Sequence, residues 1–219
     1  MLLQRLIIRL LPLEVTLFSL GAGWLIIQVM LGVMAPAPVA APPITIEPLT
    51  PAPTSVIAPL FTREVQHWAS KIAEWAAAQQ LDPNLVSTVM QIESCGAPGA
   101  VSGSGAQGLF QVMPFHFAEG EAMQDPDTNA LRGLSYLSLG LTRAGGDAGL
   151  ALAGYNGGHS QIGKDSALWP AQTKRYWYWG TGIYADAVSG QATSTRLQEW
   201  LDAGGASLCQ RAGQELGLP

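Results

Sequence analysis

One stretch of the chain concentrates side chains that could do chemistry: ESCGAPGAVSGSGAQGLFQVMP, from Glu93 to Pro114. Glu93 follows the apolar residues Val89 and Met90, and the stretch contains no Lys or Arg. A carboxyl group in apolar surroundings is harder to ionise, so its pKa should rise. Because a carboxyl that keeps its proton near neutral pH can act as a general acid, Glu93 is the first candidate for a catalytic residue.

The segment after Glu93 is rich in glycine, with five glycines between positions 96 and 108. Glycine lets a backbone turn sharply and approach a bound ligand closely. Taken alone, a glutamate at the end of a helix is more often solvated or a capping partner than catalytic. The glutamate and the glycine-rich loop together indicate a ligand-binding site.

Three ordered motifs run through the chain. The first comprises Glu93-Ser94, Pro98, Ala100, Ser102, Gly105-Ala106, Gly108-Leu109-Phe110-Gln111 and Met113-Pro114. The second is GYNGG at 154–158 and the third is QTKRYW at 172–177, while Asn129, Gly133 and Tyr136-Leu137 lie between the first two. In order and spacing these motifs resemble the lytic transglycosylase SLT-domain family, relatives of goose-type lysozymes that cleave the peptidoglycan glycan strand. The resemblance covers about residues 60–187.

The resemblance implies a mainly α, lysozyme-like domain with Glu93 as its catalytic acid/base. It also implies five residues that line the saccharide groove or steady the glutamate: Ser102, Gln111, Tyr155, Asn156 and Tyr176. Amide, hydroxyl and aromatic groups of this kind bind sugars. For the two tyrosines, packing in the core with a satisfied hydroxyl is the alternative. Trp177 and Trp179, beside Tyr176, are candidates for stacking on sugar rings.

The chain departs from the family's pattern at several positions. Gly96 and Ala97 replace Phe and Asn, Phe110 replaces Met, Gly154 and Gly157 replace alanines, and Gln172 replaces a Glu close to the groove. We expect altered packing of the loop, a looser helix at the two glycines, and an altered rate or pH dependence from Gln172. Glu93 itself is retained.

The motifs supply a single carboxylate, whereas most glycosidases use two. The acidic residues that follow in the chain, Glu119, Glu121, Asp125 and Asp127, are interpreted as a solvated loop. The resemblance therefore implies substrate-assisted cleavage of the MurNAc–GlcNAc β-1,4 bond with formation of a 1,6-anhydromuramoyl end. A hydrolytic muramidase on the same fold, or a non-catalytic wall-binding or assembly protein, are the alternatives.

Cys95 and Cys209 are the only cysteines of the chain. In an exported domain a disulfide between them is plausible, with two buried free thiols as the alternative. The histidines at 67, 116 and 159 are scattered, and no zinc-ligand spacing emerges. We expect no metal and no cofactor.

The elements that must position these residues are predicted to be helices. Thr62 caps a first helix that carries apolar residues through Trp75, and Asp82-Pro83 begins a second that ends at Glu93. Further helical patterns occupy 129–143, 147–154, 173–186 and 194–201, and alternating strand patterns are missing.

The N-terminal part differs in character. Residues 15–35 carry no charged side chain, and the segment is long enough to cross a bilayer. Arg5 and Arg9 precede it. We expect a single-pass anchor over 1–35 with the N-terminus inside and the catalytic domain outside the cytoplasmic membrane of a bacterium. A cleaved signal peptide, processed near Val39-Ala40-Ala41, is the alternative.

Residues 36–60 hold eight of the 15 prolines and are predicted to form an extended linker before a catalytic domain over 61–219. Only 12% of the residues are charged, and the net charge is −5. An acidic chain lacks the basic surface that nucleic-acid binding requires, which leaves the glycan strand and the membrane as the expected partners.

Overall fold

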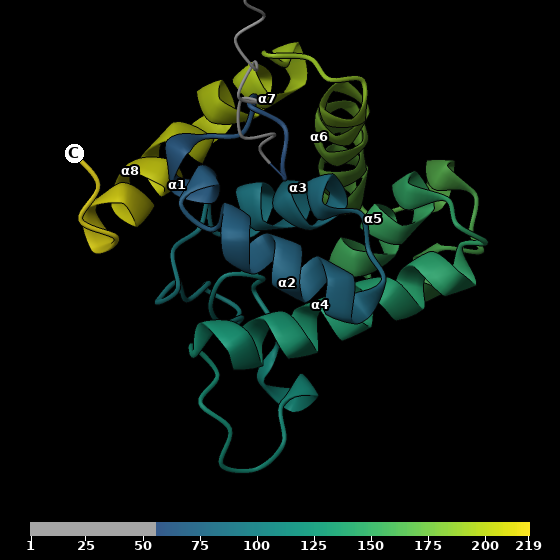
Figure 1. The fold of residues 1–219 in the computed structure, drawn as a ribbon. Helices are drawn as coiled ribbons and strands as arrows, with labels where there is room; N and C mark the ends of the chain where they lie inside the picture. The colour runs from purple at the N-terminus through teal and green to yellow at the C-terminus, as the bar shows by residue number, and fades with distance from the viewer. Residues whose placement is uncertain (1–55) are drawn as a thin grey trace, which may run out of the picture. The chain divides into compact units, whose positions relative to one another are not determined.

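The computed structural model describes residues 56–219, and these form a mainly helical domain (Figure 1). The predictions of an anchor over 1–35 and of most of the linker lie outside the described residues. Within 56–219, no helix combines the length and apolarity that a membrane crossing requires. The prediction of a mainly α domain is confirmed, since the described residues contain isolated β-bridges but no named strand.

The α-helices are α1 (Arg63–Gln66), α2 (Ala69–Gln79), α3 (Pro83–Glu93), α4 (Pro126–Arg143), α5 (Ala148–Gly157), α6 (Ala171–Val188), α7 (Thr195–Trp200) and α8 (Ala206–Glu215). Short 3₁₀ turns lie at Pro114–His116, His159–Gln161 and Ser166–Leu168, and a π-type turn, Leu201–Gly205, connects α7 to α8.

Helix α3 is largely buried and carries Glu93 at its C-terminal end. Asp82 caps its N-terminus by accepting a hydrogen bond of 2.8 Å from the Asn84 backbone N–H, and Pro83 occupies the first turn, as predicted. Helices α2 and α6 pack against α3, and α5 packs between α4 and α6 (Figure 1). The catalytic candidate therefore extends from one of the most buried helices of the domain.

The first predicted helix is divided into two in the structure. Thr62 stands at the N-cap position of α1, but its hydroxyl makes no capping hydrogen bond. The division falls at Trp68, whose indole N–H donates to the carbonyl oxygen of Gly96 at 2.9 Å. The tryptophan thus joins the start of α2 to the loop after Glu93.

The ends of the domain also differ from the sequence prediction. Ile57 and Leu60 are buried in the core, so the packed domain begins before residue 61. Helix α8 was not predicted; its segment is largely polar, and its buried residues, Cys209, Ala212 and Gly213, are small.

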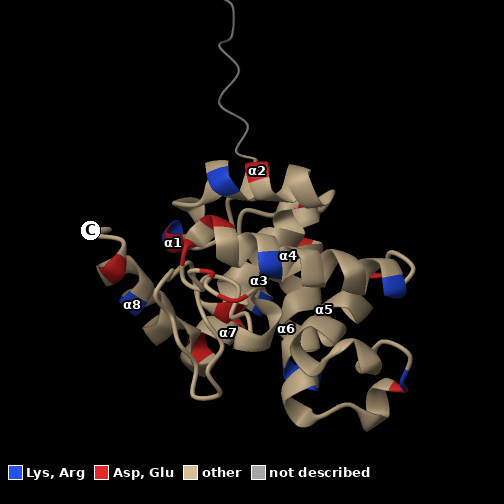
Figure 2. Ribbon diagram, turned by 90° about the horizontal axis from the view of Figure 1, so that it is seen from below, with Lys and Arg blue, Asp and Glu red and all other residues tan. Residues whose placement is uncertain are grey.

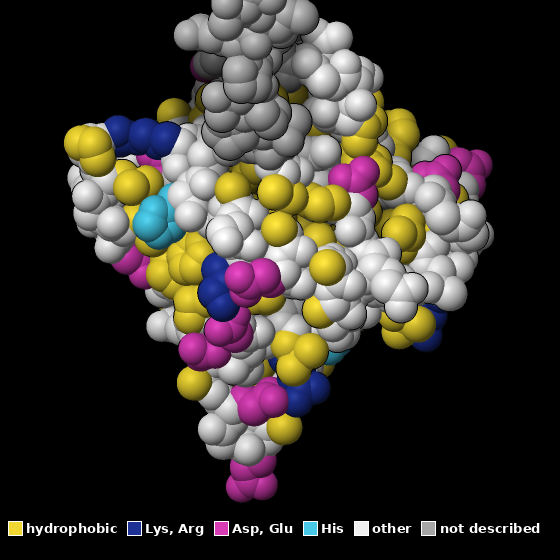
Figure 3. Space-filling model, viewed as in Figure 1, with side chains coloured by type: hydrophobic (Ala, Val, Ile, Leu, Met, Phe, Trp, Pro, Cys, Tyr) yellow, Lys and Arg dark blue, Asp and Glu magenta, His cyan; other side chains and the backbone are white. Residues whose placement is uncertain are grey.

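Charged residues are sparse and spread over the ribbon of the domain (Figure 2). On the face in Figure 3, acidic and basic side chains lie next to one another between hydrophobic ones. The acidic segment predicted as a solvated loop is more ordered than expected. Asp125 caps α4, Asp127 accepts from the Trp75 indole at 2.8 Å, and Glu121 pairs with Arg132.

Candidate active site

Glu93 is the last residue of α3, and it is partly buried. Burial raises the pKa of its carboxyl from the ordinary 4.5 to about 8, and the nearby Tyr176 lowers it by a smaller amount. No Lys or Arg forms an ion pair with Glu93 in the described part of the chain. At neutral pH the carboxyl therefore retains its proton, as a general acid requires.

Tyr155 and Tyr176 face Glu93 from α5 and α6. Burial and the charge of Glu93 raise the pKa of both phenols well above the usual value. The Tyr155 hydroxyl donates to the carbonyl oxygen of Phe110 at 2.7 Å. The Tyr176 hydroxyl is buried without a well-formed hydrogen bond in residues 56–219, although it lies close enough to Glu93 to influence its pKa.

Polar side chains fix the loop that follows Glu93. The Ser94 hydroxyl donates to the Leu109 carbonyl oxygen at 2.7 Å, so the loop folds back onto the end of α3. The Gln111 amide donates to the carbonyl oxygens of Ala100 and Gly108 at 3.1 and 3.0 Å. Both side chains of the first motif thus support the shape of the loop.

Asn129, at the start of α4, holds the same loop from the other side. Its amide oxygen accepts from the Phe110 backbone N–H at 2.9 Å, and its amide nitrogen donates to the Gln107 and Met123 carbonyl oxygens at 2.8 Å. Gly108 has φ +72°, and a Cβ there would lie 2.5 Å from the Asn129 amide nitrogen. A glycine at 108 is required both by the backbone angle and by this close approach.

Two hollows meet beside Glu93, because Asn156 lines both of them. The first, of about 290 Å³, contains Glu93. The second has a volume of about 310 Å³ and contains Gln111 and Tyr155. Among their described lining residues, Glu93 is the only carboxylic acid. The two hollows therefore offer a single carboxyl group, with amide, hydroxyl and basic side chains around it.

Four of the five predicted groove residues line the two hollows, and one does not. Gln111, Tyr155, Asn156 and Tyr176 line one or both hollows. Ser102 lines neither, and its hydroxyl accepts from the Ala106 backbone N–H at 2.9 Å and pairs with that of Ser104.

Several lining residues were not singled out as site residues by the sequence. Ile92, Arg175 and Trp200 reach the Glu93 hollow, as does Gln172, which was noted only as a departure; Met113, Phe115, His116 and Tyr136 reach the second. Met113, Tyr136, Gln172 and Arg175 lie at or between the motif positions, whereas Ile92, Phe115 and His116 do not. Trp200 comes from α7, beyond the three motifs.

The histidines that looked scattered are partly brought together. The rings of His116 and His159 lie 4.8 and 3.9 Å from the ring of Tyr136. His159 also contacts the Tyr136 carbonyl oxygen at 3.1 Å and Arg143 at 3.0 Å. Burial is the main cause of the lowered pKa of each imidazole. Of the two histidines, His116 lines the second hollow, together with Tyr136.

The two glycines that replace family alanines in the second motif do not interrupt α5, contrary to the expected loosening. A Cβ at Gly154 would lie 2.8 Å from the Ile162 side chain, and one at Gly157 would lie 2.5 Å from the Thr173 hydroxyl. Thr173 in turn donates to the Asn156 amide oxygen at 3.2 Å. The glycines permit close packing of the segment that carries Asn156.

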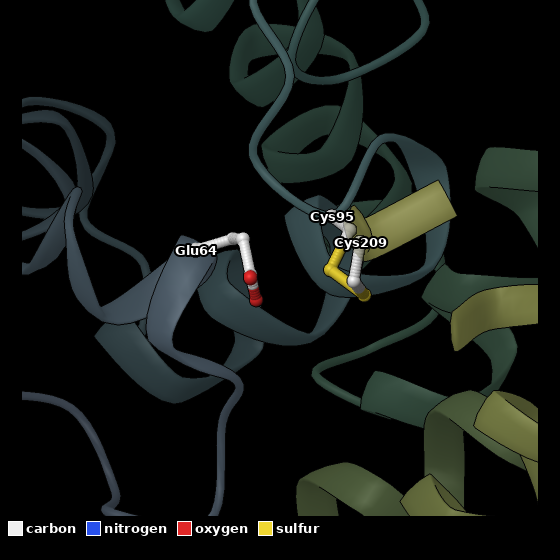
Figure 4. A group of neighbouring side chains, drawn as sticks. All are labelled: Glu64, Cys95 and Cys209. Carbon is white, nitrogen blue, oxygen red and sulfur yellow. A yellow bond between two sulfur atoms is a disulfide. The ribbon is translucent and has the colours of Figure 1, made fainter. Parts of the chain in front are cut away.

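Cys95 and Cys209 form a disulfide that links the residue next to Ser94 with α8. Figure 4 shows the pair with the Glu64 carboxylate nearby. Because both sulfur atoms are oxidised, they offer no thiolates to a metal. Glu64 instead accepts from Arg63 at 2.9 Å.

Comparison with known proteins identifies a matching family. The model of the transglycosylase SLT domain matches residues 70–178. Over 114 residues, half of this chain, the sequence is 40% identical to a transglycosylase of Enterobacteria phage PRD1, and the match spans 40% of that protein. The X-ray structure of an inactive mutant of lytic transglycosylase Slt from Pseudomonas aeruginosa is 22% identical, with a TM-score of 0.41. That similarity covers 68% of this chain and 24% of the Pseudomonas chain.

Proposed function

Residues 70–178 of the chain are a transglycosylase SLT domain, and from this premise we propose that the protein is a peptidoglycan lytic transglycosylase. The proposed reaction cleaves the MurNAc–GlcNAc β-1,4 bond and leaves a 1,6-anhydromuramoyl end. The observation that carries the proposal is Glu93, a carboxyl with a pKa of about 8 in a hollow without a second carboxylate.

In the proposed mechanism the protonated Glu93 carboxyl donates its proton to the glycosidic oxygen, and the bond to C1 of the muramoyl sugar breaks. The N-acetyl group of the same sugar stabilises the cation that develops at C1. Glu93, now a carboxylate, accepts the proton of the C6 hydroxyl, and O6 bonds to C1. The carboxyl ends with its proton restored, so the cycle needs neither a metal nor a redox partner.

Neighbouring groups support this sequence of proton transfers. The hydroxyls of Tyr155 and Tyr176 remain protonated, since the pKa of each lies well above its usual value. The Tyr155 hydroxyl is committed to the Phe110 carbonyl oxygen, so Tyr176 is the phenol available to donate to the carboxylate that Glu93 forms after giving up its proton. Asn156 places an amide where the two hollows meet, within reach of a glycan strand that occupies both.

Digestion of purified sacculi tests the proposal through the mass of the products. Anhydromuramoyl products are lighter by one water than the products of hydrolysis. Muropeptides that all carry the mass of hydrolysis products would instead identify a muramidase. Sedimentation with sacculi without any release of fragments would identify a wall-binding protein.

We further propose that residues 1–35 anchor the protein in the cytoplasmic membrane, with the N-terminus inside and the domain on the outer side. The uncharged segment 15–35 and the arginines before it support this orientation. Alkaline extraction of membranes tests the anchor. We expect the full chain to stay in the pellet and a chain lacking 1–35 to be extracted; N-terminal processing after Ala41 would overturn the anchor.

A further inference from the structure

A hollow of about 620 Å³ has about twice the volume of the one that holds Glu93. It lies between the 3₁₀ turn Ser166–Leu168 and α6, with aromatic walls from Trp169, Trp177, Tyr178 and Trp179. Binding sites for small molecules have volumes of about 300–1,000 Å³ and predominantly apolar walls. The hollow has the size and composition of such a site.

The two faces of α6 explain how this hollow arises. Thr173, Tyr176 and Gly180 are buried toward the core, whereas Lys174, Trp177 and Tyr178 fall on the outer side at i, i+3 and i+4. Trp177 is 38% exposed and Tyr178 is 45% exposed. The Trp177 ring packs against that of Trp169 with centroids 6.0 Å apart, and the Arg196 guanidinium lies 3.6 Å from the Tyr178 ring centroid. Both aromatic side chains thus have a protein partner and remain partly exposed beside the hollow.

Basic residues at the edge of the hollow define the charge of its ligand. The Lys174 ammonium group donates to the Ala167 carbonyl oxygen at 2.6 Å, and neither Lys174 nor Arg175 is paired with an acid among residues 56–219. Both line the hollow. Two unpaired cations beside apolar walls attract a ligand that combines an anionic group with an apolar body.

We propose that this hollow binds a small amphiphilic anion. The aromatic or acyl body of the ligand packs against Trp169 and Trp177, and its carboxylate, phosphate or sulfonate group pairs with Lys174. Arg175 and Trp179 line both this hollow and the one that holds Glu93, so an occupied site adjoins the candidate active site. The site is independent of the proposed cleavage reaction, since binding requires no turnover.

Photolabelling of the full chain in membranes with 4-benzoylbenzoate tests the site. This probe carries an aromatic body and one carboxylate, and 4-methylbenzophenone is its uncharged counterpart. We expect 4-benzoylbenzoate to label peptides within residues 165–196. Lys174→Glu should reduce that labelling by about tenfold, because charge reversal replaces an attraction with a repulsion. Labelling by the uncharged probe should be unchanged.

Arg211→Glu is the matched control, since Arg211 is an exposed basic residue of α8 outside the hollow. Equal loss of labelling in both variants, or labelling spread evenly over the domain, would overturn the proposal. Trp177→Ala provides a second variant that removes an aromatic wall and should also reduce labelling by the anionic probe. Unchanged labelling of this variant, with circular dichroism confirming its fold, would likewise overturn the site.

Competition identifies the source of the ligand. Short-chain phosphatidic acid below its critical micelle concentration offers an amphiphilic anion in solution, and phosphatidylglycerol vesicles offer one in a bilayer. Competition by the monomer indicates a soluble ligand, whereas competition by the vesicles alone indicates a lipid at the membrane surface. If neither reduces labelling at saturating concentration, the proposed ligand class is wrong.

Discussion

The Tyr155 hydroxyl in α5 donates a hydrogen bond of 2.7 Å to the carbonyl oxygen of Phe110, which lies in the loop after Glu93. Phe110 is fully buried. The bond joins the second sequence motif to the first. Tyr155 consequently holds the catalytic loop in place as well as lining the adjacent hollow.

Tyr155→Phe should destabilise the domain by about 1–3 kcal/mol, because the buried Phe110 carbonyl oxygen loses its side-chain partner. Urea denaturation monitored by circular dichroism measures the change. Tyr178→Phe is the matched control, since no hydrogen bond from its hydroxyl is formed within the described domain, and it should leave the midpoint unchanged. Equal midpoints for both variants would contradict the role of Tyr155.

Glu93→Gln should lower the rate of sacculus solubilisation by about 10²–10⁴-fold, because an amide cannot donate the acid proton. The fold should be retained, since glutamine has nearly the same shape. Glu119→Gln serves as the control: Glu119 is exposed and lies outside both hollows. Retention of full activity by Glu93→Gln would show that the acid is elsewhere.

The pKa of Glu93 predicts how activity depends on pH. The first step uses the protonated carboxyl, so kcat/KM should fall as pH rises through about 8. Initial rates of solubilisation between pH 6 and 10 measure this limb. A profile that stays flat to pH 10 would mean that Glu93 does not donate the proton.

The same pKa predicts how the stability depends on pH. The folded protein holds the Glu93 proton up to about pH 8, whereas the unfolded chain releases it near 4.5. The stabilisation that the protonated Glu93 carboxyl gives the folded state is therefore fully present below pH 4.5 and is lost as pH rises through 8. Relative to wild type, Glu93→Gln should gain several kcal/mol, at most about 5, between pH 4.5 and 9. Denaturation of both proteins at each pH tests this, and a constant difference would refute it.

The disulfide predicts a dependence on reducing agent. Joining Cys95 to Cys209 closes a loop with a sequence separation of 114 residues. In the chain-entropy model such a loop stabilises the folded state by roughly 4–5 kcal/mol. A chain with both Cys95→Ser and Cys209→Ser should lose most of this, and wild type in dithiothreitol should unfold at the same urea concentration as that variant. Insensitivity of the wild-type midpoint to the reductant would argue against the disulfide.

Sequence patterns predicted those parts of the fold that depend on local signals. Asp82-Pro83 marked the start of α3, and the apolar residues after it placed Glu93 at the helix end. Helix α8 escaped prediction; its segment is largely polar, and its buried residues are small. The division at Trp68 also has no local signal, since the indole bonds to Gly96 in a distant segment.

Site residues that belong to a sequence motif could be predicted. Residues that distant segments bring to the site could not. Gln111, Tyr155, Asn156 and Tyr176 line the hollows, as the motifs indicated. Trp200 reaches the Glu93 hollow only through the packing of α7 against α6. No spacing in the sequence encodes that packing.

The end of α3 at Glu93 has an electrostatic consequence for the proposed cycle. The last carbonyl groups of a helix carry a partial negative charge equivalent to about half an elementary charge. A carboxylate formed at this end is disfavoured by a further 0.3–1 kcal/mol or so, in addition to the effect of burial. The helix dipole thus favours recapture of a proton by Glu93, so the backbone of α3 itself drives the acid back to its starting state.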